Sequence, residues 1–258
     1  SINLKFNPNH TVRLGYSSAL RTANYVEEKF NRRVTVPTVA PNPTLLVQFY
    51  ADRGNLDPEQ IISREIGYLG KLGNISLDTR IFHDTINDHI RIANRDDFVT
   101  PPGFFLVNPG AVATGANGGY AVIQGFEAQA KWHLASSTHL MLNFAHVNIR
   151  ERQRRLTNNF DESMPSNTIS ALLTHKFNQN WDASFAYYQT SETTQLGDGT
   201  NVDLIRRADL RVARRFNAGR WNGEVSAVVE NLFNNHYEEF AYYNTLNRRG
   251  RINLRLDF

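Results

Sequence analysis

The sequence predicts an all-β fold, an antiparallel up-and-down transmembrane β-barrel. Three observations predict it: apolar and polar residues alternate with a period of two, the connections are alternately short and long, and aromatic residues gather at strand ends. The pattern gives about eleven strands in 258 residues. Because single-chain barrels of this kind normally have an even number of strands, either one strand is missed or the chain belongs to a larger barrel.

The first part of the chain contains two predicted hairpins. SINLKF and HTVRLGYSS are joined by the tight turn NPN, and PEQIISREIGYLG and NISLDTRIFHD are joined by residues 71–73. A long irregular segment rich in Asn and Pro separates the hairpins, from about Arg21 to Asp57. A second irregular segment is predicted from roughly Asp88 to Gly118, and its GANGG run is interpreted as a flexible loop entering a strand.

The same unit then repeats three times. The pairs are GFEAQAKWHL with HLMLNFAHV, NTISALLTHKF with WDASFAYYQT, and IRRADLRVARRF with WNGEVSAVVENLF. The long connections are RERQRRLTNNFDE, ETTQLGDGTN and a loop from about Asn234 to Arg248. In the closing strand RINLRLDF, the residues Ile252, Leu254, Leu256 and Phe258 lie on one face, and Asn253, Arg255 and Asp257 lie on the other.

Both faces of the predicted strands fit a membrane barrel. The polar face carries charges of both signs on neighbouring strands, which a dry core would not tolerate and a water-filled lumen would, so cross-strand ion pairs are expected there. The strands are longer than those usual in soluble sheets. Aromatic residues of the apolar face lie beside the short turns, where an interfacial girdle is expected: Trp132, Trp181, Trp221, Phe177, Phe216 and Phe258.

Composition excludes several classes. Hydrophobic residues make up 41% of the chain and no run of about 18 apolar residues offers a transmembrane helix. The net charge of +3 and the scattered basic residues argue against a nucleic-acid partner. The absence of cysteine removes disulfides and thiolate sites. Since the chain begins at Ser1, we expect a processed protein or a piece of one.

Several segments together resemble the C-terminal half of a TonB-dependent outer-membrane receptor. They are YSSALRTANYVEE, NLDPEQIISREIGY, QGFEAQAKWHL and VVENLFNNHYEEF. Their order is specific to that family, and the resemblance covers nearly the whole chain. The resemblance implies that residues 1–258 are the C-terminal part of a 22-stranded barrel domain. The plug domain and TonB box of the family are not visible in this chain, so energised transport is not expected of it alone.

The resemblance implies a receptor or transporter for a scarce nutrient, most often a ferric siderophore, in the outer membrane of a Gram-negative bacterium. Its partners would be the TonB complex through the plug, the barrel-assembly machinery, and membrane lipid and lipopolysaccharide. The sequence has no G-x-S-x-G, H-E-x-x-H or Walker loop, so we expect no enzyme and no cofactor. A passive porin-like barrel and a soluble β-rich binding domain remain as alternatives, because a β-sandwich also alternates.

Candidate ligand-binding residues lie on the long connections, since specificity usually sits on loops held by a rigid scaffold. They are the aromatic and cationic residues Arg21, Tyr50, Arg152, Arg154, Arg155, Tyr242, Tyr243 and Arg248. The alternative for these residues is a set of solvated loops that contact lipopolysaccharide. Leu254, Leu256 and the terminal Phe258 resemble the C-terminal signal that the barrel-assembly machinery reads. The eight histidines form no apparent ligand cluster, so no metal site is expected.

Overall fold

The structure is a computed structural model that describes residues 1–152, 160–194, 200–219, 221–239 and 245–257. Strands make up most of this part of the chain, which has a single α-helix, α1 (Tyr25–Lys29), and one turn of 3₁₀-helix, η1 (Phe160–Glu162). Among the described residues, neither helix has the length and apolar character needed to cross a bilayer. The all-β prediction is therefore confirmed.

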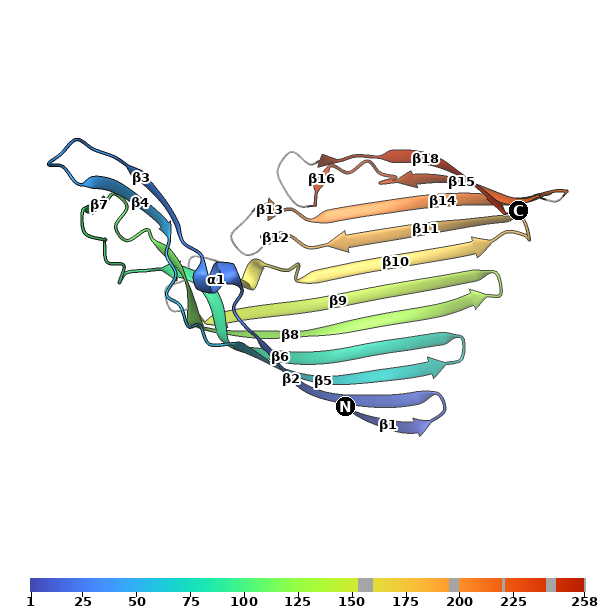
Figure 1. The fold of residues 1–258 in the computed structure, drawn as a ribbon. Helices are drawn as coiled ribbons and strands as arrows, with labels where there is room; N and C mark the ends of the chain where they lie inside the picture. Colours follow the sequence, from blue (N-terminus) through green and yellow to red (C-terminus); the bar gives the residue numbers. More distant parts are fainter. Residues whose placement is uncertain (153–159, 195–199, 220, 240–244, 258) are drawn as a thin grey trace.

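Eleven strands pair one after another, each antiparallel to the next, in one large sheet (Figure 1). This number agrees with the strands predicted from the alternation. In spatial order they are β1 (Ile2–Asn7), β2 (His10–Arg21), β5 (Glu59–Leu72), β6 (Ile75–Asn94), β8 (Ala113–Ala135), β9 (Thr138–Arg152), β10 (Asn167–Lys176), β11 (Trp181–Thr190), β14 (Ile205–Ala218), β15 (Trp221–Glu230) and β18 (Arg249–Asp257).

The two ends of the sheet differ as the sequence predicted. Tight turns such as residues 8–9, 73–74 and 136–137 join the strands at one end. The connections at the other end are long, and the longest spans residues 22–58. The side chains of Trp132, Trp181 and Trp221 are 40%, 40% and 37% exposed and lie beside the tight turns, where the aromatic girdle was predicted.

The register places one kind of side chain on each face. Leu14, Ile66, Ile81 and Phe126 are paired in sequence across β2, β5, β6 and β8, and Ile66 and Ile81 remain about 60% exposed. The adjacent row on the other face is Arg13, Gly67, Arg80 and Glu127, which carries charges of both signs. Exposed apolar side chains on one face of the strands are typical of a barrel wall whose outer face contacts lipid.

The sheet is open rather than closed. Among the described residues, β1 pairs only with β2 and β18 pairs only with β15, so each has one edge without a strand partner. Backbone groups inside a bilayer must be paired within the protein. The open edges therefore agree with the expectation that these strands form part of a larger barrel.

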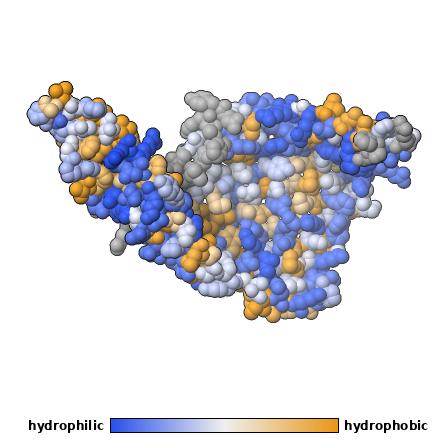
Figure 2. Space-filling view, viewed as in Figure 1, coloured by the Kyte–Doolittle hydropathy of each residue, from blue (hydrophilic) through white to orange (hydrophobic). Residues whose placement is uncertain are grey.

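Three further strands form an arm that projects from the end with the long connections (Figure 1). β3 (Arg32–Val36) pairs antiparallel with β4 (Thr44–Tyr50), and β4 pairs parallel with β7 (Phe104–Leu106). The arm thus joins two different connections. Its far end carries hydrophobic residues among hydrophilic ones in the space-filling view (Figure 2).

Two sequence predictions were wrong in this region. The segments predicted as irregular contain α1 and the arm, and β6 continues to Asn94 while β8 begins at Ala113, so the GANGG run lies within a strand. The pairing of β6 with β8 has register shifts between Ile86 and His89 and between His89 and Arg91. Such shifts interrupt the alternation, and the arm depends on pairing between distant segments, so local pattern did not reveal either feature.

Two small hairpins complete the described elements: β12 (Thr193–Thr194) with β13 (Asn201–Val202), and β16 (Tyr237–Glu238) with β17 (Thr245–Leu246).

Candidate functional site

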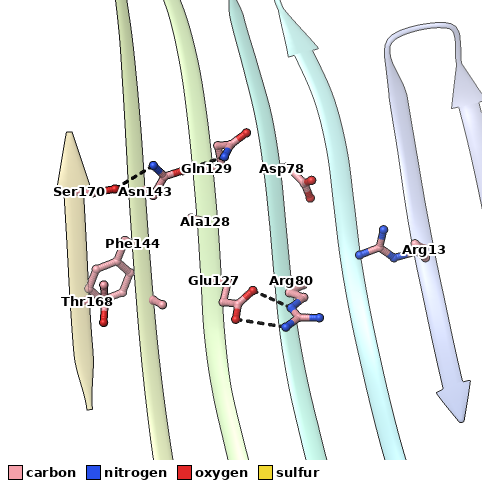
Figure 3. Close-up of a pocket in the computed structure, with 11 residues that line it drawn as sticks. Arg13, Asp78, Arg80, Glu127, Ala128, Gln129, Asn143, Phe144, Thr168 and Ser170 are labelled. Atoms are coloured by element: carbon pink, nitrogen blue, oxygen red, sulfur yellow. Dashed lines mark hydrogen bonds and ion pairs between the residues drawn. The ribbon is translucent and has the colours of Figure 1, made fainter. Parts of the chain in front are cut away.

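A ladder of charged side chains crosses the polar face of the sheet (Figure 3). Arg13 Nε lies 3.1 Å from Glu65 Oε1, and Arg80 Nη1 lies 3.4 Å from Glu65 Oε2. Arg80 also donates from Nε to Glu127 Oε2 at 2.8 Å and from Nη2 to Glu127 Oε1 at 3.1 Å. The ladder joins β2, β5, β6 and β8, so each charge has an opposite charge on a neighbouring strand.

The ladder continues as neutral hydrogen bonds on the next strands. Gln129 Nε2 donates to Asn143 Oδ1 at 2.8 Å, and Asn143 Nδ2 donates to Ser170 Oγ at 2.9 Å (Figure 3). These residues line a shallow pocket on the polar face together with Arg13, Arg80 and Glu127 of the ladder. The wall is therefore polar and wettable across β2 to β10.

A second group of ion pairs crosses the other half of the sheet. Asp182 on β11 accepts from Arg211 Nη1 at 2.7 Å and from Arg215 Nη2 at 2.8 Å, and Arg211 also pairs with Glu224 on β15. Arg251 on β18 lies 2.7 Å from Glu230 on β15. The cross-strand ion pairs expected from the sequence are thus present. The side chains of Arg211, Arg215 and Arg251 are 32% to 62% exposed, so these pairs shape the wall more than they stabilise it.

The ends of the strands next to the long connections hold a denser group of charges, which we call the rim cluster: Arg21, Glu27, Glu59, His89, Arg91 and Glu151. Arg21, the last residue of β2, lies 3.0 Å through Nη1 from Glu27 Oε2 of α1, and its Nε pairs with Glu59, the first residue of β5. Glu59 Oε1 also accepts the backbone N–H of Ile90 at 2.6 Å.

The rim cluster continues through His89 to the next strands. His89 Nε2 lies 3.6 Å from Glu59 Oε1, and His89 Nδ1 lies 3.3 Å from Glu151 Oε1. Arg91 Nη1 donates to Glu151 Oε2 at 3.0 Å. The ring of Phe160 in η1 lies at 4.8 Å from the His89 ring, and the Arg91 guanidinium lies 5.5 Å from its centre. The cluster therefore connects β2, β5, β6 and β9 with α1 and η1 of the long connections.

Local sequence explains how the cluster can be so dense. A Cβ at Gly115 on β8 would lie 2.2 Å from the Glu27 carbonyl oxygen, so only glycine lets α1 approach the strand here. A Cβ at Gly119 would lie 2.8 Å from Cβ of His89. Asn24 caps α1: its side chain accepts from the Glu27 backbone N–H while the Glu27 carboxylate accepts from the Asn24 N–H.

Comparison with known families identifies the chain. The model of a family described as TonB dependent receptor-like, beta-barrel matches residues 1–232. The chain belongs to this TonB-dependent receptor family. Members of the family are outer-membrane proteins and are not enzymes, so we take the short turns as periplasmic and the long connections as external. No curated protein matches the sequence.

Solved structures share the fold of this receptor barrel at low sequence identity. The siderophore receptor PirA from Acinetobacter baumannii has a TM-score of 0.66 and 17% identity, covering 91% of this chain and 36% of that chain. The pyoverdine receptor FpvA from Pseudomonas aeruginosa has a TM-score of 0.67 and 16% identity, covering 99% of this chain and 35% of that chain. The copper transporter OprC has a TM-score of 0.65 and 16% identity, covering 97% and 37%. The chain thus spans about a third of the length of these proteins.

Two of the predicted ligand-binding residues lie together at the external rim. Arg21 pairs with Glu27 and Glu59, and Tyr50, the last residue of β4, donates its hydroxyl to the Glu27 carbonyl at 3.3 Å. Both residues therefore contact Glu27 of α1 and fix the helix against the rim. The Tyr50 side chain is buried, with 7% of the residue exposed, and this burial raises the pKa of its phenol.

The other predicted residues lie elsewhere. Arg152 is exposed at the end of β9 opposite Tyr120, and Arg248 donates its backbone N–H to Asn234 Oδ1 at 2.9 Å. Among the described residues, no hydrogen bond or ion pair links either of them to Arg21 or Tyr50. Leu254 and Leu256 lie on the apolar face of β18, 62% and 45% exposed. The remaining candidates lie outside the described residues: Arg154, Arg155, Tyr242, Tyr243 and Phe258.

Sequence reasoning missed five members of the rim cluster: Glu27, Glu59, His89, Arg91 and Glu151. Glu59 and Glu151 carry a detectable signal, since each is a charge on the polar face at the external end of a strand. His89 and Arg91 carry none, because both follow a register shift. In the described part of the chain no group of three or more His, Cys, Asp or Glu residues is arranged to hold a metal ion.

Proposed function

We propose that residues 1–258 form the C-terminal part of the barrel domain of an outer-membrane receptor that takes up a scarce nutrient. The observation that carries the proposal is the polar wall, which runs across neighbouring strands and ends externally in the rim cluster that holds α1 and η1. A wall of this kind offers a hydrated surface to a polar cargo, and the rim fixes the bases of the loops that would capture it.

We propose a ferric siderophore as the cargo. PirA and FpvA, which share the fold, are receptors for siderophores, and this similarity supports the choice. The exposed Arg152 and the cationic and aromatic residues Arg154, Arg155, Tyr242, Tyr243 and Arg248 would contact an anionic chelate. Arg21 and Tyr50 would act with them by fixing the rim on which these loops rest.

The remaining partners follow from the same proposal. A plug domain elsewhere in the protein would couple the barrel to the TonB complex, and movement of the plug would open the polar wall as a path. The apolar face of the sheet would contact lipid, with lipopolysaccharide around the external half. Leu254, Leu256 and Phe258 would form the signal for the barrel-assembly machinery.

The test uses the full-length receptor in its native host. Iron-loaded siderophores are supplied to wild-type cells and to cells lacking TonB, and surface binding and internal iron are measured separately. We expect the loss of TonB to abolish uptake and to leave surface binding intact. Uptake that persists without TonB would contradict the proposal and favour a passive pore, which liposome swelling with the purified protein would then show.

A further inference from the structure

The periplasmic rim carries a pair of histidines that the receptor function does not use. His133, near the end of β8, and His139, near the start of β9, face each other across the tight turn at residues 136–137. Their Nδ1 atoms are 2.8 Å apart, and the ring centres are separated by 4.7 Å at an interplanar angle of 82°. One ring therefore donates its proton to the other.

The backbone explains why the rings are so close. The N–H of His133 donates at 2.9 Å to the carbonyl of Asn74, on the side of β6. In an antiparallel sheet, a residue that bonds to one neighbour forms a non-hydrogen-bonded pair with the other, and side chains are closest in such pairs. Asn74 also donates from its side chain to the His133 carbonyl at 2.6 Å, which fixes the strand from which the ring projects.

Both rings lie on the polar face. His133 alternates in step with Glu127, Gln129 and Lys131, and the register shift of β8 comes only after it. His133 is exposed and His139 is half-buried, so water reaches both rings. The pair therefore stands at the periplasmic edge of the polar wall, where a small solute can approach it.

We propose that His133 and His139 bind a divalent transition-metal ion, with water completing the coordination. Metal–nitrogen bonds are about 2.0–2.1 Å long, so a nitrogen separation of 2.8 Å corresponds to an angle of about 90° at the metal. This is the angle of two adjacent ligands in tetragonal Cu(II) or Ni(II). A tetrahedral Zn(II) would need the two nitrogens to separate to about 3.4 Å.

Binding changes only the shared proton and the ring torsions. Both Nδ1 lone pairs must point at the metal, so the ring that carries the Nδ1 proton gives it to solvent or shifts it to Nε2, and each ring turns away from the line that joins the two nitrogens. The exposed His133 ring can make this turn without moving the backbone. The proposal involves only these two side chains, so it stands or falls independently of the cargo of the receptor.

The experiment is a titration of the full-length receptor, purified in detergent without a polyhistidine tag and stripped with a chelator, with Cu²⁺. Calorimetry measures affinity, and electron paramagnetic resonance reports nitrogen ligands. We expect His133→Asn and His139→Asn each to weaken one Cu²⁺ site about tenfold or more, because each removes one of two ligands. The matched control is His175→Asn. His175 lies near the same end of the sheet but hydrogen-bonds Thr138 at 2.8 Å, and its loss should leave the titration unchanged.

Heat-modifiable migration on gels shows that each variant has kept its barrel. Folded His133→Asn and His139→Asn proteins whose Cu²⁺ titrations and spectra match the wild type would overturn the proposal. Loss of the site in the His175→Asn variant alone would also overturn it: Thr174, not His175, is paired with His139, so His175 lies on the opposite face of the sheet. Loss of binding as the pH falls is expected as well, since a protonated imidazole cannot bind a metal.

Discussion

Glu151 and Arg91 form the most buried ion pair of the external rim among the described residues. Arg91 Nη1 lies 3.0 Å from Glu151 Oε2, and the two side chains are 7% and 2% exposed. The same carboxylate faces His89 Nδ1 at 3.3 Å, and the backbone N–H of Glu151 donates to Asp161 at 2.6 Å. This pair thus joins the barrel wall to the connection that follows β9.

The first prediction concerns this pair. Glu151→Gln keeps the shape of the side chain but removes the charge that balances Arg91, so we expect the free energy of local opening at the rim to fall by about 2 kcal/mol. Hydrogen exchange of the amides around η1 in the full-length receptor measures this. Asp97→Asn is the control: Asp97 is exposed, and although Arg53 at 2.8 Å holds the pKa of its carboxyl below the usual value, its loss should leave exchange at the rim unchanged. Equal exchange in Glu151→Gln and wild type would show that the rim does not depend on the pair.

The second prediction concerns the contact between α1 and β8. In Gly115→Ala the new methyl group would meet the Glu27 carbonyl oxygen at 2.2 Å, so α1 must move away from the strand. We expect faster exchange in residues 22–58, weaker siderophore binding, and an unchanged heat-modifiable barrel. Gly250→Ala in β18 is the control because no atom lies within 4 Å of its Cβ position. If Gly115→Ala and Gly250→Ala bound the siderophore equally well, the position of α1 would have no effect on ligand binding.

The third prediction compares adjacent residues on opposite faces of β9. Leu142 lies on the apolar face, 43% exposed, and Asn143 lies in the polar ladder. Leu142→Lys places a charge towards lipid and should cost about 2–4 kcal/mol, whereas Asn143→Lys remains in a hydrated wall and loses hydrogen bonds worth about 1 kcal/mol each. Urea unfolding of the receptor in lipid vesicles measures both. A larger loss for Asn143→Lys would mean that the two faces have been assigned the wrong way round.

The sequence was sufficient to predict the regular part of the fold. Apart from shifts beside two tight turns, between Lys5 and Asn7 and between His133 and Ala135, the spanning strands keep their register up to the external end, so their alternation could be recognised directly in the sequence. The shifts that concealed part of the rim cluster lie at the external end. His89 and Arg91 face the rim because of register shifts, and no local pattern marks where an extra residue enters a strand.

The candidate site was predicted only in part, for a related reason. Arg21 and Tyr50 were identified from their residue types and their position next to a long connection, and the structure brings both to Glu27. The arm depends on parallel pairing between Leu45 and Phe105, which come from separate connections. Pairing across such a sequence distance is set by tertiary packing and leaves no periodic trace in either segment.

The last prediction tests the attachment of the arm through its pH dependence. Burial raises the pKa of Tyr50 in the folded arm, so the contribution of this residue to stability is fully present below the ordinary value of about 10 and is lost as the pH rises through the folded pKa. We expect subtilisin to cleave residues 22–58 of the receptor progressively faster above about pH 10. In Tyr50→Phe the loss of the 3.3 Å bond to Glu27 should raise cleavage slightly at neutral pH and abolish that part of the alkaline increase. The other titrating groups are the same in both proteins, so the ratio of the cleavage rates of wild type and Tyr50→Phe reports the ionisation of the Tyr50 phenol alone. A ratio that does not change with pH would show that Tyr50 does not control release of the arm.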